Sequence, residues 1–559
     1  MHPGNRWGSG SFKLGGEEID VVDRRTSRDS EWDMSAVYHE QQQQHYEQLT
    51  ETQKSWLLEP NYNNKRKKSK YVDFGCIVCS DKAVKWSVFG ILLAFCVIAL
   101  PIIIVNTLPK AKPRSIPPDS YSLALHEALL FFNAQKSGRL PKSNGIPWRG
   151  NSGLNDGKDI TDQLNGSAGM VGGGQNGSTT PNDENCWQKP ENMDYPRPTQ
   201  ICYEGPDLAG EMAAAFAAAS IVFQDDNAYS RKLVRGAETV YAFARDGSKR
   251  RSYSHDNLYI SPYYNSTGYY DEYIWGATWL YYATGNATYI SLATTAGFAR
   301  NSKAFSNIPN LSVPSWDNKL PAAMLLLTRF RMFLSPGYPY EDMLQMYHNT
   351  TGLRMCKYFK RFNVFNFTRG GLIMLNQGGP QPLQYAATAA FLASLYADYM
   401  DVIGVPGFYC GPNYFSLLDL RNFATSQVDY ILGNNPMKMS YVVGYGKNFP
   451  RHVYHRGASI PSDNKYYSCT GGYVWRDTRN PNPHNITGAM VGGPDQVDRF
   501  NDKRSHYINE PTMAGNAGLV AALVSLTENG GSGIDKNTMF SAIPPLSPPS
   551  PSPPPPWKP

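Results

Sequence analysis

The sequence predicts an all-α domain that follows a single membrane-spanning helix. The first observation is a run of twenty uncharged residues, 86–105. The second is a set of nine later segments in which apolar residues recur with the period of an α-helix, separated by irregular stretches rich in Gly, Pro, Asn and Tyr. Strands and helices do not alternate, which argues against an α/β fold. Recurring helices joined by elaborate loops are typical of a toroid of helix hairpins.

The uncharged run has the length of a transmembrane helix, because about twenty residues at 1.5 Å each cross a hydrocarbon core of about 30 Å. It is long for a signal-peptide core or a buried helix, and it begins too far from residue 1 for a signal peptide. Basic residues are denser before it than after it, which marks the cytoplasmic side: Lys65, Arg66, Lys67, Lys68, Lys70, Lys82 and Lys85, against Lys110, Lys112 and Arg114. We therefore expect a single-pass type II membrane protein.

The glycosylation signals agree with this orientation. All eight Asn-x-Ser/Thr sequons follow the span, and none precedes it: Asn165, Asn176, Asn265, Asn286, Asn310, Asn349, Asn366 and Asn485. Five cysteines also follow the span: Cys186, Cys202, Cys356, Cys410 and Cys469. We expect at most two disulfides, with one thiol left over.

Composition divides the chain into five parts. Residues 1–85 are polar and should form a disordered cytosolic arm. The span, 86–105, is followed by a Pro-rich spacer, 106–118. Residues 119–530 form the folded domain, and residues 531–559 are a Pro/Ser-rich, disordered tail without a packed core. The net charge of +6 owes much to the basic run before the span, so it favours anionic lipid over nucleic acid as a partner.

The first helix of the domain is predicted to begin at Asp119 or Ser120 and to end at Gly138. Its predicted core-facing residues are Tyr121, Leu125, Ala128 or Leu129, and Phe132. The other eight helices are predicted at about 207–223, 229–246, 270–284, 321–335, 340–358, 383–403, 417–433 and 513–528.

The loops between these helices carry motifs that resemble one family: Ser137–Pro141, Trp148–Ser152, Ser178–Asp183 with Cys186 and Trp187, Asp271–Glu272 with Trp275 and Trp279, Ser315–Lys319, Leu334–Pro339, Pro380–Tyr385, Tyr430–Pro436, His455–Ser459 and Glu510–Ala517. Together they resemble the family nine glycoside hydrolases. With the arm and the span, the chain is similar to the plant membrane-anchored endo-1,4-β-glucanases of the KORRIGAN type, over residues 50–530.

The resemblance implies an (α/α)6 toroid that cleaves internal β-1,4-glucosidic bonds of cellulose or related glucans. It also implies a function in cell-wall metabolism, a link to the cellulose-synthesis machinery, and a location at the plasma membrane or in Golgi or endosomal membranes. The chemistry needs no metal ion or organic cofactor.

Two carboxyl groups carry the inverting hydrolysis that the resemblance implies. One protonates the leaving oxygen, and the other, about 6.5–9.5 Å away, activates a water molecule. Glu510 matches the family's acid, although a helix cap before Ala514 is the plainer interpretation. Asp502 matches a second acidic position that supports the site, with a solvated surface aspartate as the alternative. The spacing between the two is one residue shorter than in the family pattern.

His455 and Arg456 match the substrate-binding His-His-Arg segment of the family, with Tyr454 in place of the first histidine. A guanidinium offers five donors in a fixed fork, which suits sugar hydroxyls. A loop histidine and a surface arginine are the plainer alternatives. Tryptophans that could stack on glucose rings, although each alone is more often structural, are Trp187, Trp275 and Trp316.

The largest departure from the family concerns the catalytic base. The family carries Gly-Gly-Tyr-Tyr-Asp-Ala-Gly-Asp after Arg-Gly-Asn-Ser, but Asp-Ala-Gly-Asp occurs nowhere in this chain. We therefore expect the base to be absent and the toroid to be incomplete. Asp159 or Asp162 would replace the base only by coincidence. Gln377-Gly378 likewise stands where the family has His-Gly.

Three functions follow from these observations. The first is a membrane-anchored glucanase whose activity is impaired by loss of the base. The second is a non-catalytic relative that binds glucan or partner proteins. The third is a receptor-like or wall-tethering protein that uses the Pro-rich tail. It is disfavoured because the sequence before the span contains no recognisable signalling domain.

The orientation predicts N-glycosylation of the full-length protein in plant membranes. Treatment with a peptide N-glycosidase that accepts plant glycans should increase its electrophoretic mobility, because every sequon lies on the non-cytosolic side. Unchanged mobility would contradict the proposed orientation.

Overall fold

The computed structural model describes residues 120–155, 186–194, 204–257, 264–505 and 508–527, with the short segments 13–14, 17–18, 71–73, 78–80, 170–172 and 200–202 and the single residues Trp86 and Ser261. The chain divides into two units, Val22–Pro117, and Met1–Val21 with Pro118–Pro559. The long helices belong to the second unit.

No helix within the described segments is both long enough and apolar enough to cross a membrane. The predicted span lies outside those segments apart from Trp86, and so do the spacer and the Pro-rich tail. Within residues 1–85, two short antiparallel pairs are described: β1 (Lys13–Leu14) with β2 (Glu17–Glu18), and β3 (Tyr71–Asp73) with β4 (Val78–Ser80).

Nine helices of at least 14 residues are found in the described part of the folded domain. They are α4 (Ser120–Gln135), α5 (Pro206–Val222), α6 (Asn227–Ala244), α7 (Tyr270–Thr284), α10 (Leu320–Leu334), α11 (Glu341–Cys356), α12 (Pro382–Val402), α13 (Leu417–Leu432) and α16 (Met513–Leu526). The eight later helices begin and end within two residues of the predicted positions. The helical periodicity therefore located all nine.

Shorter elements lie in the connections. They are α8 (Ala287–Ala293), α9 (Ala296–Asn301), α14 (Arg456–Ser459), α15 (Tyr473–Asp477), the 3-10 turns η3 (Pro190–Asn192), η4 (Pro309–Ser312) and η5 (Lys360–Phe362), and the antiparallel pairs β5 (Met170–Gly172) with β6 (Gln200–Cys202) and β7 (Gly407–Cys410) with β8 (Asn413–Ser416). These connections supply most of the candidate site.

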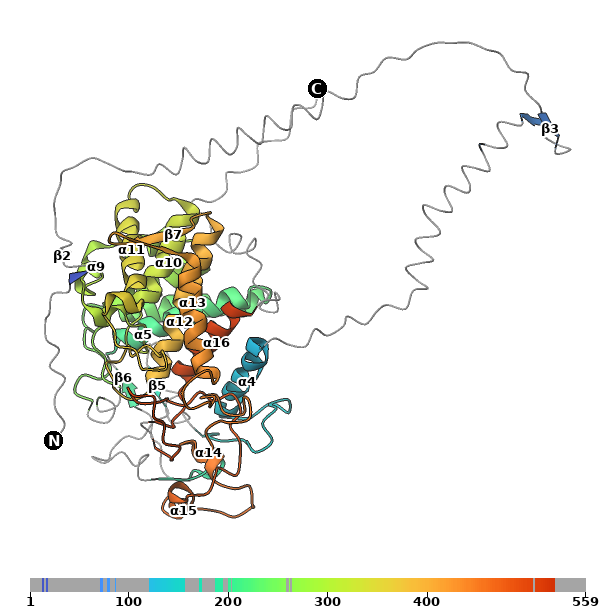
Figure 1. Ribbon diagram of the computed structural model, residues 1–559, viewed down its shortest axis with the longest axis vertical. Coiled ribbons are helices and arrows are strands. Elements are labelled where there is room, and N and C mark those ends of the chain that lie inside the picture. Colours follow the sequence, from blue (N-terminus) through green and yellow to red (C-terminus); the bar gives the residue numbers. More distant parts are fainter. Residues whose placement is uncertain are drawn as a thin grey trace, which may run out of the picture. The chain divides into compact units, whose positions relative to one another are not determined.

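The long helices pack on one another in a connected series. Helix α5 packs on α6 and α7, α10 on α7 and α11, α12 on α13 and α16, and α16 on α4. Figure 1 shows α4 and α16 side by side, although they come from opposite ends of the domain. One hydrophobic core lies among α4, α12, α13 and α16, and another among α5, α6, α7, α10 and α11. This helix-rich arrangement is consistent with an (α/α)6 toroid.

Small residues set the spacing between these helices. A Cβ at Gly210 of α5 would lie 2.8 Å from the Cβ of Glu272 in α7, so only glycine allows this approach. In α12, eight alanine or leucine residues are no more than 2% exposed, and this helix packs closely on α16.

The predicted core face of α4 is confirmed in part, because Ala128 is buried and Tyr121, Leu125 and Phe132 pack, partly buried, against the core. Its buried residues are Ala124, Ala128, Phe131 and Ala134, whereas Leu129 is 49% exposed. The helix is closely approached by the loop at Gly488, where a Cβ would lie 1.7 Å from the carbonyl oxygen of Glu127. Ala128 lies at the same contact, and its small side chain fits there.

Two disulfides join distant segments, as the cysteine count predicts. Cys186 is bonded to Cys469, and Cys356 at the end of α11 is bonded to Cys410 at the end of β7. The fifth cysteine, Cys202, lies in β6 and belongs to neither bridge. The expectation of two bridges is therefore confirmed.

Two cations are buried beside each other at the C-terminal end of α11. Arg354 Nη2 donates to the carbonyl oxygen of Ala304 at 2.9 Å, and Lys357 Nζ donates to that of Asn307 at 3.5 Å. Burial, together with the like charge of Arg354, lowers the pKa of Lys357 to about 7 from its ordinary 10.5. The folded chain therefore gives up the proton of Lys357 more readily than the unfolded chain.

Substitution Lys357→Met should raise the melting temperature at pH 6 and have a smaller effect at pH 10. Between about pH 7 and 10.5 the unfolded chain binds more protons than the folded one at this position, so this contribution to stability increases with pH. Calorimetric scans at several pH values measure the difference between variant and parent. A difference that is constant from pH 6 to pH 10 would contradict the lowered pKa.

Candidate active site

Glu510 lies just before the N-terminus of α16 but does not cap the helix. The N-cap is Thr512, whose Oγ1 accepts a hydrogen bond from Gly515 N at 3.1 Å. The Glu510 side chain is partly exposed. Burial, and then the charge of Glu510, raise the pKa of Tyr264, which shows that the two side chains are electrostatic neighbours. The helix-cap interpretation of Glu510 is therefore excluded.

Tyr264 is in contact with a second aromatic ring, that of Trp316. Tyr264 is 49% exposed, and its ring meets that of Trp316 edge to face at 5.3 Å. Trp316 is itself partly exposed, as a sugar-stacking residue must be. Periodicity and motifs predict Trp316 but miss Tyr264, because Tyr264 lies in an irregular loop without a motif.

The carboxylate of Asp502 accepts hydrogen bonds from three surrounding groups. Oδ2 accepts from Arg451 N at 2.8 Å and lies 3.0 Å from His452 Nδ1, while Oδ1 accepts from His452 N at 3.1 Å and from Asn509 Nδ2 at 2.9 Å. Asp502 is therefore neither a free surface aspartate nor an open catalytic carboxylate. It joins the 451–452 segment to the residue that precedes Glu510.

Asn509 extends this connection to the predicted substrate-binding segment. It is fully buried, its Nδ2 also donates to the carbonyl oxygen of His452 at 3.0 Å, and its own carbonyl oxygen accepts from Tyr454 N at 3.0 Å. These bonds fix Glu510 beside the segment that begins at Tyr454. The sequence motifs matched Glu510 and Asp502 but gave no indication of Asn509.

His455 caps the short helix α14. Its Nδ1 accepts from Ala458 N at 3.1 Å, at the start of α14, and its Nε2 lies 3.4 Å from the Gln135 amide. Burial, followed by the charges of Arg149 and Arg456, lowers its pKa to about 3. A neutral ring with both nitrogens engaged is poorly suited to proton transfer, so these contacts do not support the predicted catalytic function of His455.

Tyr454 and Arg456 both pack against Trp187. The ring centroids of Tyr454 and Trp187 lie 4.7 Å apart, and the Arg456 guanidinium lies 5.8 Å from the Trp187 ring. Trp187 is only 2% exposed, and its Nε1 donates to Ser459 Oγ at 2.9 Å. A glucose ring therefore has no open face of Trp187 to stack on, which corrects that prediction.

Trp275 has a packing function as well. It meets Trp279 edge to face at 5.6 Å and lies against the core formed by α5, α6, α7, α10 and α11. The remaining candidates for sugar binding are Tyr264 and Trp316, whose rings meet, and Tyr454 and Arg456, which pack on Trp187.

A group of carboxylates near Trp316 was not predicted as a site. Asp317 accepts from Thr267 N at 2.9 Å and from Thr267 Oγ1 at 2.7 Å, and burial raises its pKa. Glu211 pairs with Lys319 Nζ at 2.6 Å, and burial also raises the pKa of Glu211. The side chain of Glu272 is buried, which raises its pKa well above 4.5. Part of this group, Asp271–Glu272 and Ser315–Lys319, was recognisable only as family motifs.

Some predicted residues cannot be placed. Asp159, Asp162, Asn165 and Asn176 lie outside the described residues. Five of the other sequon asparagines, Asn265, Asn286, Asn349, Asn366 and Asn485, are exposed, as glycan attachment requires. Asn310 is partly buried and accepts from Gln377 Nε2 at 2.9 Å. In the described segments no group of three or more His, Cys, Asp or Glu side chains is arranged to hold a metal ion.

A cavity of about 590 Å³ lies beside the start of α12, where Gln377-Gly378 departs from the family pattern. Its lining includes Gly378, Gln381, Arg499 and Ile508 but not Glu510, Tyr454 or Arg456. The candidate site is therefore defined by the side chains around Glu510 and not by this cavity.

Substitution Asp502→Asn should lower the free energy of unfolding by about 1–3 kcal/mol, because an amide nitrogen would face N–H donors that now meet a carboxylate oxygen. Urea unfolding measures the change. The same substitution at Asp477, which is exposed and paired with the adjacent Arg476, should change it by less than about 0.5 kcal/mol. Equal effects at both positions would show that Asp502 does not anchor the site.

Comparison with known proteins explains the motifs. The model of glycosyl hydrolase family 9 matches residues 121–177 and 161–523, in two segments. The chain is 51% identical to Endoglucanase 12 of Oryza sativa subsp. japonica and 49% identical to Endoglucanase 7 of Arabidopsis thaliana, with complete coverage of both chains in each case.

Solved structures give the same result. An endoglucanase of the termite Nasutitermes takasagoensis superposes with a TM-score of 0.59 and 28% identity, covering 73% of this chain and 98% of that chain. Endoglucanase CelQ of Clostridium thermocellum, solved with cellotriose, gives 0.58 and 27%, covering 74% and 71%. The helices, the motifs and the long matching segments together lead to one conclusion: the chain belongs to glycosyl hydrolase family 9.

Proposed function

We propose that this protein is an endo-β-1,4-glucanase of family 9 that keeps the proton donor of the reaction but lacks its water-activating carboxylate. The observation that carries the proposal is the position of Glu510, which Asn509 holds beside Tyr454 and which neighbours Tyr264. A partly exposed carboxyl group among aromatic rings and a guanidinium suits protonation of a glycosidic oxygen. The substrate is a β-1,4-glucan, because the relatives are named endoglucanases and CelQ was solved with cellotriose.

In this reaction Glu510 donates its proton to the leaving oxygen while Arg456 and Tyr454 bind sugar hydroxyls. Inversion also requires a carboxylate that takes a proton from the attacking water. No Asp-Ala-Gly-Asp occurs in the sequence to supply it. Loss of a general base slows the step that it assists by about 10²–10⁴-fold.

A missing internal segment accounts for this loss. The alignment with the rice relative spans 633 positions, whereas the chain has 559 residues, so the relative contains residues that have no counterpart here. The two segments of the family match meet at residues 161–177, between α4 and α5. This is also where the Asp-Ala-Gly-Asp segment is expected.

Helix α5, which follows this break, and α16, which packs on α4, keep apolar side chains exposed. Val222 at the end of α5 is 76% exposed and Met513 at the start of α16 is 59% exposed, and both Ala215 and Ala517 are exposed as well. Helices that are apolar on all sides are normally buried. We infer that these faces lost the helices that would cover them and that the toroid is incomplete.

A second candidate function, favoured by the absent base, is glucan binding without turnover. The binding residues Tyr454, Arg456, Tyr264 and Trp316 do not depend on the missing segment. In either case the predicted span would anchor the domain at a membrane, with the site outside the cytosol, where newly made glucan and the cellulose-synthesis machinery are accessible.

Restoring the segment tests the proposal. The residues of rice Endoglucanase 12 that align with the gap are inserted into this chain, and hydrolysis of carboxymethyl-cellulose is measured. We expect the rate to rise by about 10²–10⁴-fold, because the insertion supplies a base. Adding Glu510→Gln to the chimera should remove the gain. A parent chain that already hydrolyses the substrate at the rate of the chimera would show that its base is not missing.

A further inference from the structure

The segment 186–194 reaches the candidate site only through contacts with residues far away in the sequence. Cys186 is bonded to Cys469, which is 283 residues later, and Trp187 N donates to the carbonyl oxygen of Cys469 at 2.9 Å. The backbone approach is so close that a Cβ at Gly472 would lie 1.5 Å from Trp187 O. The disulfide therefore fixes the backbone at the tryptophan that follows it.

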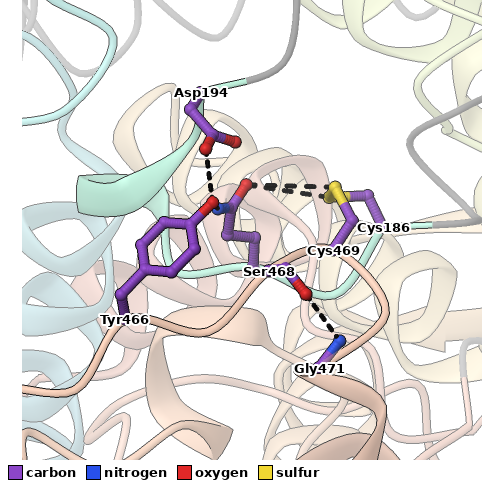
Figure 2. The surroundings of a disulfide bond; sticks show 7 residues. Cys186, Asp194, Tyr466, Ser468, Cys469 and Gly471 are labelled. Carbon is purple, nitrogen blue, oxygen red and sulfur yellow. Dashed lines mark hydrogen bonds between the residues drawn. A yellow bond between two sulfur atoms is a disulfide. The ribbon is translucent and has the colours of Figure 1, made fainter.

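Figure 2 shows how side chains surround this disulfide. The oxygen of the fully buried Gln188 amide lies 4.0 Å from Cys186 Sγ and 3.9 Å from Cys469 Sγ, and its nitrogen donates to Tyr466 Oη at 3.3 Å. Tyr466 in turn donates to Asp194. The contacts at both ends of segment 186–194 thus attach it to the 466–469 loop.

A second connection holds the other side of the segment. Glu191 accepts from Arg149 Nε at 2.7 Å and from Gly150 N at 3.0 Å. Arg149 also donates to the carbonyl oxygens of Ala134 and Lys136, at the C-terminal end of α4. Segment 186–194 therefore lies between the end of α4 and the loop that carries Tyr454 and Arg456.

We propose that the Cys186–Cys469 disulfide is a positioning element for glucan binding, because it holds Trp187 as the support beneath Tyr454 and Arg456. The Trp187 ring is buried, contacts both side chains and is fixed at its far edge by Ser459. Trp187 restricts the rotamers of both side chains before the sugar arrives, so less conformational freedom is lost on binding. This proposal rests on the glucan site proposed above.

The other disulfide provides a matched control. Cys356–Cys410 also joins two parts of the domain, but it links the end of α11 to β7 and not the segment that holds Trp187. Removing either bridge should destabilise the domain, whereas only removal of Cys186–Cys469 should weaken binding.

The experiment uses the full-length protein in detergent with Glu510→Gln as the parent, so that bound sugar is not cleaved. Cellotetraose binding is measured by calorimetry well below the melting temperature of each variant. We expect Cys186→Ala/Cys469→Ala to raise Kd about tenfold, as misplacement of a binding residue does, and Cys356→Ala/Cys410→Ala to leave Kd within about twofold of the parent. Equal Kd values for both double variants, each shown to be folded by circular dichroism, would refute the proposal.

Two variants that keep the bridge test the same proposal if the cysteine variant does not fold. Trp187→Ala should raise Kd about tenfold, and Trp187→Phe should recover most of the loss, because a ring remains beneath Tyr454. If Trp187→Ala has the same Kd as the parent, the proposal that Trp187 positions Tyr454 and Arg456 is refuted, while the proposed glucan site is not affected. Failure of the parent itself to bind cellotetraose would refute the proposed glucan site and this proposal with it.

Discussion

The candidate site depends on the hydrogen bonds that the Asp502 carboxylate accepts. Its two oxygens join the backbone at residues 451 and 452 to the side chain of Asn509, and Asn509 joins that loop to Tyr454. Charged acceptors form stronger hydrogen bonds than neutral ones, which suits a junction between two irregular loops. Glu510 is one residue beyond this junction, so its position is set by the hydrogen bonds of its neighbours Asp502 and Asn509.

The rest of the candidate site also contains some residues that support others and some that are exposed. His455 and Trp187 look like binding residues in the sequence, but the structure uses the first as a helix cap and the second as a buried support. Tyr264 and Trp316 have the exposed rings instead. Aromatic residues suit both tasks because a ring buries a large apolar area and has few rotatable bonds.

The helical scaffold relies on small residues. Alanines and glycines let α5 approach α7, and α4 approach the loop at Gly488, at distances that larger side chains would prevent. Such helices are apolar on most sides and need neighbours all round. The exposed apolar residues of α5 and α16 therefore form faces that are suited to contact with further helices.

The sequence alone determined the number and limits of the nine long helices, because helical periodicity is a local property that each segment carries by itself. It also gave the cysteine count and the family motifs around Glu510. Only the tertiary structure decided which residues of α4 are fully buried, that Thr512 and not Glu510 caps α16, and that Asn509 and Tyr264 belong to the candidate site. These features depend on contacts between residues that are far apart in the chain, and no local pattern records which distant backbone will approach a given side chain.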